Sequence, residues 1–237
     1  MPFVYVPFMH APLECAPPRW FSRLPAAAAP CALRPVATPP PLFYSLDGAR
    51  IEAGAPPAPP VSSTAPTLIV NPTHASAGFG SQRIIYVRTA QQIEYFSHNE
   101  WVDTPARMLA PLIVAAIERS GSFRAAVLTP SAAAGELRLD TDIVRLQHDF
   151  GSNPSHVRFT LRAYVVDNAT RQVLGWREFD ETAVAASGDP AGGVAAANLA
   201  VQKVLTQLAG FCTETAALWQ RAVVRVPKRD AAMPVVR

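Results

Sequence analysis

Cysteine is scarce in this chain, and its spacing excludes two classes of small domain, those held together by disulfides and those held together by a cysteine-bound metal. The 237 residues contain three cysteines, Cys15, Cys31 and Cys212, and no CxxC pair. An odd number without that spacing supports neither a disulfide framework nor a cysteine-based metal site. Cys212 lies on the apolar stripe of an expected helix, which predicts a buried, unreactive thiol.

The sequence also lacks the short motifs that mark common enzyme sites. It contains no GxSxG, GxxxxGK[ST] or HExxH segment, and no GxGxxG between a strand and a helix. Its five histidines share no metal-ligand spacing. Asp140 and Asp142 lie two apart on one expected strand, where solvated carboxylates are a simpler interpretation than acid–base catalysis. We therefore predict a protein that is not an enzyme and uses no cofactor or metal.

Charged residues and long apolar runs are also few. Only 16% of the residues are charged and the mean hydropathy is +0.12, which favours a protein that works near membranes or in an assembly. No window of ~20 apolar residues occurs, so no membrane-spanning helix is expected. The net charge is +3, with scattered arginines and no basic run, and nucleic-acid binding is not predicted.

Proline, in contrast, is abundant and divides the chain. Of 24 prolines, 16 fall at or before Pro66, where a regular packed core cannot form. We predict an unreliable or disordered leader over residues 1–30, a Pro-rich tether over 31–66, a single domain over 67–220, and a disordered basic tail over 221–237. The leader lacks the apolar core of a secretory signal, which indicates an incorrect start site or reading frame, or a disordered extension.

Strand patterns dominate the expected domain. Apolar and polar residues alternate from His156 to Val166, as in a strand with one buried face. Residues 136–150 and 173–184 flank this strand, which predicts an antiparallel meander of three long strands. The apolar face changes side near Ile143, which indicates a bulge. Shorter strands are expected at 67–70, 83–88, 93–96 and 123–128, and the strand-like run 42–46 inside the tether could add to a sheet edge.

Two amphipathic helices complete the expected fold. Thr104 and Pro105 mark the start of the first helix, and Gly121 marks its end. The second is expected from about Val194 to Leu218, with Asp189 as a candidate cap. Apolar stripes on both helices can lie on the sheet. The predicted class is α+β, a largely antiparallel sheet of about six strands with both helices packed on one face.

Aromatic residues cluster where a short strand approaches the first helix. Tyr95, Phe96 and Trp101 gather there beside His98. Packing in the core or at the sheet edge would explain the cluster, but Tyr and Trp are also enriched at protein interfaces. We therefore take these four residues as the predicted partner-contact residues.

Cys31 stands directly before the Pro-rich tether. A lipidated cysteine followed by such a tether would hold the domain at a membrane surface. Pro30 occupies the position where bacterial lipoprotein signals carry a small residue such as Gly or Ala. The sequence thus suggests a lipidation site at Cys31 with a departure from the usual signal.

The order of these segments resembles the ABC-type transport auxiliary lipoprotein family, the PqiC/YmbA-like proteins of Gram-negative envelopes. The likeness covers roughly Cys31 to Trp219. Its most specific parts are Tyr86, the run from Tyr95 to Trp101, and the stretch from Leu146 to Phe150.

The resemblance implies a periplasmic lipoprotein, anchored to the outer membrane by lipid on Cys31. It also implies partners, namely an MCE-domain substrate-binding protein with an ABC permease and ATPase. Such a system moves lipids between the inner and outer membranes. Whether the chain forms a homo-oligomer is left open.

Two other functions stay open at this stage. The first is an envelope assembly or pilot lipoprotein unrelated to lipid transport. The second is a periplasmic hydrolase that uses His98 or His156 with Asp140 or Asp142. The hydrolase requires these side chains to lie within hydrogen-bond reach of one another, about 3 Å.

Overall fold

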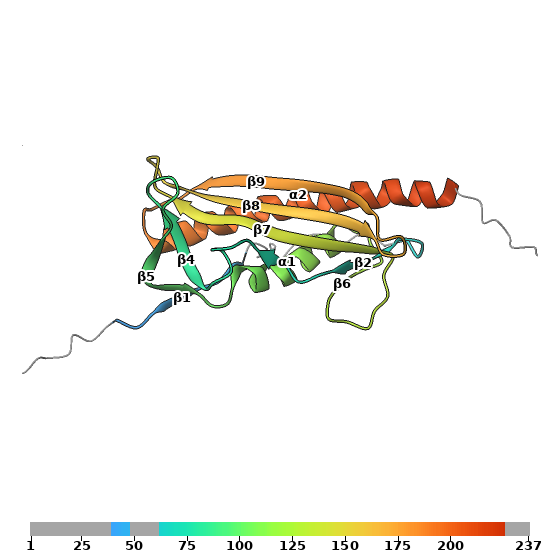
Figure 1. Cartoon of the computed structure of the whole chain (residues 1–237), viewed down its shortest axis with the longest axis horizontal. Helices are drawn as coiled ribbons and strands as arrows, with labels where there is room; N and C mark the ends of the chain where they lie inside the picture. The colour runs from blue at the N-terminus through green and yellow to red at the C-terminus, as the bar shows by residue number, and fades with distance from the viewer. Residues whose placement is uncertain (1–38, 48–61, 226–237) are drawn as a thin grey trace, which may run out of the picture. The chain divides into compact units, whose positions relative to one another are not determined.

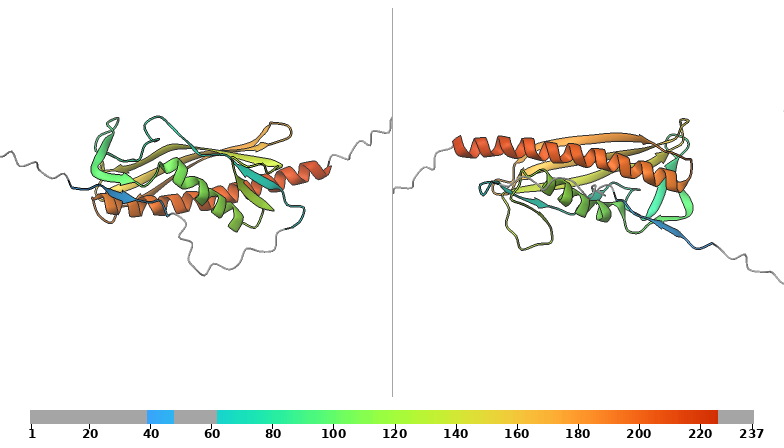
Figure 2. Two further views of the ribbon diagram at one scale, coloured as in Figure 1. Left: turned by 90° about the horizontal axis from the view of Figure 1, so that it is seen from below. Right: turned by 180° about the vertical axis from the view of Figure 1, so that it is seen from behind.

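A mixed sheet with helices on one face forms the body of the protein. The computed structural model describes residues 39–47 and 62–225. Within these ranges nine strands form one sheet, and two helices lie on the same side of it (Figures 1 and 2). The α+β class predicted from the sequence is confirmed.

Three long strands make the predicted meander. They are β7 (Leu137–Asp149), β8 (His156–Asp167) and β9 (Val173–Val184), and each pairs with the next in antiparallel register. The register between β7 and β8 shifts between Ile143 and Arg145, which confirms the bulge that the sequence indicated.

The other edge of β7 is shared by three short strands in series. These are β2 (Thr67–Val70), β3 (His74–Ala75) and β4 (Arg83–Val87), all parallel to β7. Beyond them, β6 (Ala125–Leu128) pairs in parallel with β2, and β5 (Glu94–Trp101) pairs antiparallel with β4. The sheet is therefore antiparallel in its long strands and largely parallel in its short ones, with more strands than the six expected.

Part of the predicted tether belongs to the sheet. β1 (Leu42–Tyr44) pairs in parallel with β5, as the strand-like run at 42–46 suggested. Leu46 is buried in the core, and the Asp47 amide donates a 2.6 Å hydrogen bond to Oδ1 of Asn198 in the second helix. The strand pairing of β1 and these two contacts after it together hold residues 42–47 against the domain.

The first helix, α1 (Pro105–Arg119), has the expected ends. Thr104 occupies the N-cap position, but its side chain makes no capping hydrogen bond; instead Asp103 Oδ1 accepts from the Thr104 amide. Gly121 ends the helix with a φ of +65°, a left-handed conformation that glycine adopts without steric cost.

The second helix, α2 (Pro190–Arg225), is longer than predicted. Asp189 Oδ1 accepts a 2.7 Å hydrogen bond from the Gly192 amide and so caps the helix four residues before Val194. At the other end the helix runs to Arg225, five residues into the range assigned to a disordered tail. The rest of that tail lies outside the described residues.

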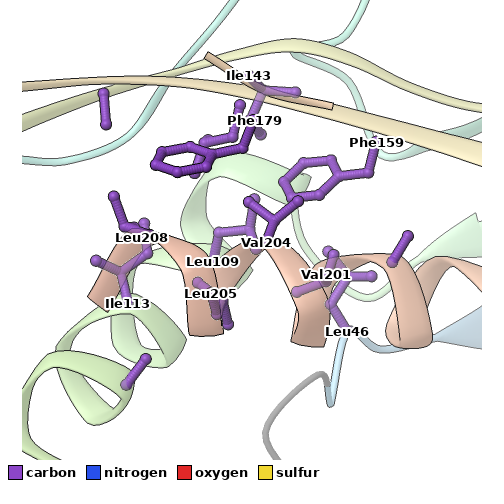
Figure 3. Packing of buried hydrophobic residues seen from close by; sticks show 14 of the residues in the cluster. Leu46, Leu109, Ile113, Ile143, Phe159, Phe179, Val201, Val204, Leu205 and Leu208 are labelled. Atoms are coloured by element: carbon purple, nitrogen blue, oxygen red, sulfur yellow. The ribbon is translucent and has the colours of Figure 1, made fainter. Parts of the chain in front are cut away.

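The core fills the space between the sheet and the two helices. Phe159 and Phe179 reach from the meander toward Val204 and Leu208 of α2, while Leu109 of α1 closes the cluster (Figure 3). Burial of each such side chain contributes about 1.5–3 kcal/mol. Within the same cluster Cys212 is fully buried, and this burial raises the pKa of its thiol to about 12, as an unreactive thiol requires.

Candidate functional site

Exposed apolar side chains gather at the sheet edge formed by β1 and β5. Five of them lie on these strands or directly beside β5, and we call them the β1–β5 surface: Leu42, Phe43, Ile93, Tyr95 and Val102. Leu42 and Phe43 are 59% and 58% exposed. Because five exposed apolar side chains lie along this one edge, the edge is the candidate contact surface.

The structure divides the four predicted partner-contact residues. Tyr95 is exposed, with the Arg83 guanidinium 5.0 Å above its ring, and His98 is exposed in a left-handed conformation with φ +57°. Phe96 is half-buried, and Trp101 is only 4% exposed. Tyr95 and His98 are therefore accessible to a partner, whereas the Trp101 side chain has almost no exposed surface.

Trp101 is buried in the core, where it lines one pocket with Leu146 of β7 and Val194 of α2. Tyr44 stands opposite Trp101 in the parallel register, and the Trp101 amide donates a 2.7 Å hydrogen bond to the Gln82 carbonyl. The pairing of Tyr44 with Trp101 joins residues more than fifty positions apart in sequence. Nothing local in the sequence distinguishes this tryptophan from an exposed one.

Four aromatic rings from β4, β5 and the end of β7 form one cluster. Tyr86 and Phe96 have ring centroids 4.5 Å apart, and His148 lies 4.2 Å from Phe150 and 6.2 Å from Phe96. The Tyr86 hydroxyl donates to Glu94 Oε2 at 2.8 Å, and this hydrogen bond raises the pKa of Tyr86. The cluster holds the β1–β5 surface against the body of the sheet.

His148 is the buried polar member of this cluster. It is 2% exposed, its Nε2 lies 2.9 Å from Ser155 Oγ, and its Nδ1 has no hydrogen-bond partner among the described residues. Burial, followed by the nearby His156, lowers the pKa of His148. Nδ1 packs against Gly193 in the first turn of α2, where an added Cβ would lie 2.5 Å away. The site is closed by packing, so His148 has a structural role.

A serine, a histidine and an aspartate approach one another in the turn between β7 and β8. Ser152 Oγ lies 3.0 Å from Nδ1 of His156, and His156 Nε2 lies 4.0 Å from Asp149 Oδ2. The Ser152 hydroxyl, however, donates its proton to the Pro154 carbonyl at 3.0 Å. The histidine then acts as the donor to Ser152, so it is not placed to activate this hydroxyl as a nucleophile.

The hydrolase arrangement considered from the sequence does not form around His156. His156 stands opposite Asp149, whereas Asp142 stands opposite Arg162. Seven strand positions at ~3.3 Å each separate the two aspartates by roughly 23 Å. Asp140 lies farther still and accepts a 2.6 Å hydrogen bond from Asn71.

His98 is no better placed for that chemistry. It lies on β5, and β4 stands between β5 and the strand that carries Asp140 and Asp142. Within the described ranges no group of three or more His, Cys, Asp or Glu side chains is arranged to hold a metal ion. The helices described there do not combine the length and apolar composition needed to cross a membrane.

The face of the meander opposite the helices carries paired charges. Arg158 forms a bidentate ion pair with Asp180, and Arg162 pairs with Glu178 at 2.7 Å. The hydrogen bonds from Arg158 lower the pKa of Asp180 to about 2. Beside these pairs the exposed Trp176 stacks on Tyr164, with centroids 6.4 Å apart. We call this side of β8 and β9 the open face.

Comparisons with known proteins identify a family and a fold. Residues 44–209 match the model of the family described as ABC-type transport auxiliary lipoprotein component. Protein XCC0632 from Xanthomonas campestris has a similar structure, with a TM-score of 0.61 and 23% identity over 68% of this chain and 94% of that one. At that identity the likeness shows the fold alone.

A second solved structure is more distant. The hypothetical protein CT253 from Chlamydia trachomatis gives a TM-score of 0.44 and 9% identity over 64% of this chain and 98% of that one. No curated protein matches the sequence.

Proposed function

The chain belongs to the family of ABC-type transport auxiliary lipoprotein components, and from this membership we propose that it is a non-enzymatic, periplasmic accessory subunit of an MCE-type ABC system. The system would move lipids between the inner and outer membranes. The observation that carries this proposal is the family match, which extends from β1 through most of α2.

The anchor in this proposal is Cys31, which lies outside the described residues. Acyl chains on this cysteine would hold the domain at the outer membrane, since each buried CH₂ contributes about 0.8 kcal/mol. The energy for transport would come from the ATPase, and the chain itself would act only by binding.

The β1–β5 surface is the proposed site of contact with the MCE-domain partner. Phe43 and Tyr95 supply the large apolar and aromatic side chains that typically dominate binding energy. Arg83 above the Tyr95 ring and the exposed His98 give the surface a polar margin. In addition, β1 is the outermost strand on this side of the sheet among the described residues, so its outer edge can pair with a strand of a partner.

Co-purification from envelope extracts tests both the partner and the surface. The intact lipoprotein should recover the MCE-domain and permease subunits, identified by mass spectrometry. The double variant Phe43→Ser, Tyr95→Ser should recover at least about tenfold less, because loss of two interface anchors typically costs ~2 kcal/mol or more.

A matched control distinguishes a contact from a general loss of apolar surface. Val173→Ser with Trp176→Ser removes two similarly exposed apolar side chains from β9. This variant should recover the partners normally. If both variants recover equally less of the partner subunits, the β1–β5 surface is not the contact site. Recovery of a different envelope complex would favour the assembly or pilot function instead.

A further inference from the structure

A groove lies along β7 where the sheet has a gap. On this side of β7, β3 pairs with it as far as Ile143, and β4 pairs with it from His148 onward. Among the described residues, no strand pairs with residues 144–147 on that side. The groove is bounded by β7, by the turn between β4 and β5, and by Phe79. Its volume of about 630 Å³ lies within the usual range of small-molecule sites.

The bulge of β7 directs two consecutive side chains to this groove. Ile143 and Leu146 are both buried, with 0% and 5% exposure, although they are three positions apart. Regular strand alternation would place one of them on the opposite face. The shift of register between Ile143 and Arg145 removes this conflict. Val144 and Arg145 are therefore both left out of the core, and both line the groove as half-buried side chains.

Arg145 differs from the other arginines of these long strands. β7 and β8 carry four arginines, and three of them form ion pairs: Arg138 with Asp140, Arg158 with Asp180, and Arg162 with Glu178. Within the described part of the chain, Arg145 forms neither an ion pair nor a side-chain hydrogen bond. Because a half-buried guanidinium has lost part of its hydration, an anionic ligand would restore its hydrogen bonds.

The other charges of the groove are already engaged. Arg88 also lines it, but its guanidinium pairs with Glu94 at 3.5 Å. The one carboxylate of the lining is Asp149, whose Oδ1 accepts a 2.7 Å hydrogen bond from the Gly151 amide. Arg145 is thus the cation available to a ligand, and its planar guanidinium fits one carboxylate or phosphate group through two parallel hydrogen bonds.

Apolar side chains from three segments complete the lining. They are Phe79, Val87, Ile93 and Val144. An aliphatic chain that contacts them loses its water, and each fully buried methylene strengthens binding by roughly fourfold. A cation beside apolar side chains matches a molecule with one charged end and one aliphatic end.

We propose that this groove binds a small anionic amphiphile, with its phosphate or carboxylate head on Arg145 and its aliphatic chain against Phe79 and Val144. The site goes beyond the proposed accessory function and does not depend on the MCE-domain partner. A strand of a partner protein fits the groove less well, because β3 and β4 occupy the same edge of β7 on either side of the gap.

Isothermal titration calorimetry on the full chain tests this proposal. The chain carries Cys31→Ser, so that no attached acyl chain competes for the groove. The probes are octyl phosphate and octanoate below their micelle concentrations, with octanol and inorganic phosphate as the separate halves. At least one of the two amphiphiles should bind at least about tenfold more tightly than octanol and inorganic phosphate, since each half lacks one set of contacts.

Substitutions locate the binding on the chain. Arg145→Gln should weaken binding of the amphiphile by about tenfold or more. Arg119→Gln removes the same charge from an exposed position on α1 and should leave binding within about twofold. Val144→Ser keeps every charge and should still weaken binding by several-fold, because it removes apolar contact. Circular dichroism verifies that each variant is folded.

Two crossed measurements separate this site from the proposed partner contact. The variant Phe43→Ser, Tyr95→Ser should bind the amphiphile as the parent chain does, and Arg145→Gln should recover the partner subunits normally. The proposal is wrong if neither amphiphile binds, if inorganic phosphate binds as tightly as octyl phosphate, or if Arg145→Gln and Arg119→Gln weaken binding alike. If neither amphiphile binds and Arg145→Gln also recovers less of the partner subunits, the groove belongs to the protein interface instead.

Discussion

The two faces of the meander are built from the same strands, but one carries buried apolar side chains and the other carries exposed charged ones. On the covered face Phe159 and Phe179 are almost completely buried against α2. On the open face the neighbouring positions hold Arg158, Asp180 and the exposed Trp176. Strand alternation separates the two sets along most of the meander. Stability is therefore concentrated on one face, and the other is free to vary or to bind.

The largest effect should come from a cavity on the covered face. Phe159→Ala removes a fully buried ring and should lower the free energy of unfolding by about 3–5 kcal/mol. Trp176→Ala removes an even larger side chain that is 62% exposed, and should cost well under half of that. Urea unfolding of both variants measures the contrast, and similar losses would show that the open face also carries the fold.

A steric change at the end of the covered face should have the second-largest effect on stability. Gly193→Ala places a methyl group 2.5 Å from Nδ1 of His148, which is too buried to move aside, and should cost about 1–3 kcal/mol. Gly210→Ala on the same helix meets no atom within 4 Å and should instead stabilise by about 1 kcal/mol. Opposite signs of the two shifts in melting temperature are the expected result.

The covered face should also respond to acid through His148. Because its pKa is lowered in the folded protein, the unfolded chain binds more protons as the pH falls below the ordinary histidine value of about 6.5. Stability should thus be complete above that pH and decline below it. His148→Phe should flatten this dependence in urea unfolding, whereas His98→Asn, at an exposed position, should retain it.

The smallest effect is expected from the ion pairs of the open face. Asp180→Asn breaks the pairing with Arg158, yet both side chains are more than a third exposed. Solvent screens such pairs, so the loss should stay within about 1 kcal/mol. Since the pKa of Asp180 is lowered to about 2, this small contribution is present above the ordinary aspartate range and disappears as the pH falls toward 2. A loss of stability comparable with that of Phe159→Ala would contradict the contrast between the covered and the open face.

Local pattern predicted the long strands but not the pairing of the short ones. The alternation in β8 and the bulge at Ile143 follow from residues adjacent in sequence, and both are confirmed. β3 is only two residues long, His74 and Ala75, and a strand of that length has no period to detect. Its parallel pairing with β7 joins segments about seventy positions apart, so only the folded chain reveals it.

The candidate site was predictable only in part for the same reason. Tyr95 and His98 were identified from the sequence and lie on the surface, but Trp101 is buried against core residues from distant parts of the chain, among them Leu146 and Val194. The contact between His148 and Gly193 also spans two separate elements. No spacing rule in the sequence connects a strand histidine with a glycine of a later helix turn.

The docking of β1 sets how far the domain can stand from its anchor. With Cys31 as the proposed anchor, eleven residues lead to Leu42, and a fully extended chain of that length spans at most about 40 Å. Were β1 to detach together with Leu46 and Asp47, thirty-six residues would lead to Thr67, with a limit of about 130 Å. The docking of residues 42–47 thus sets the greatest distance between the proposed anchor and the domain.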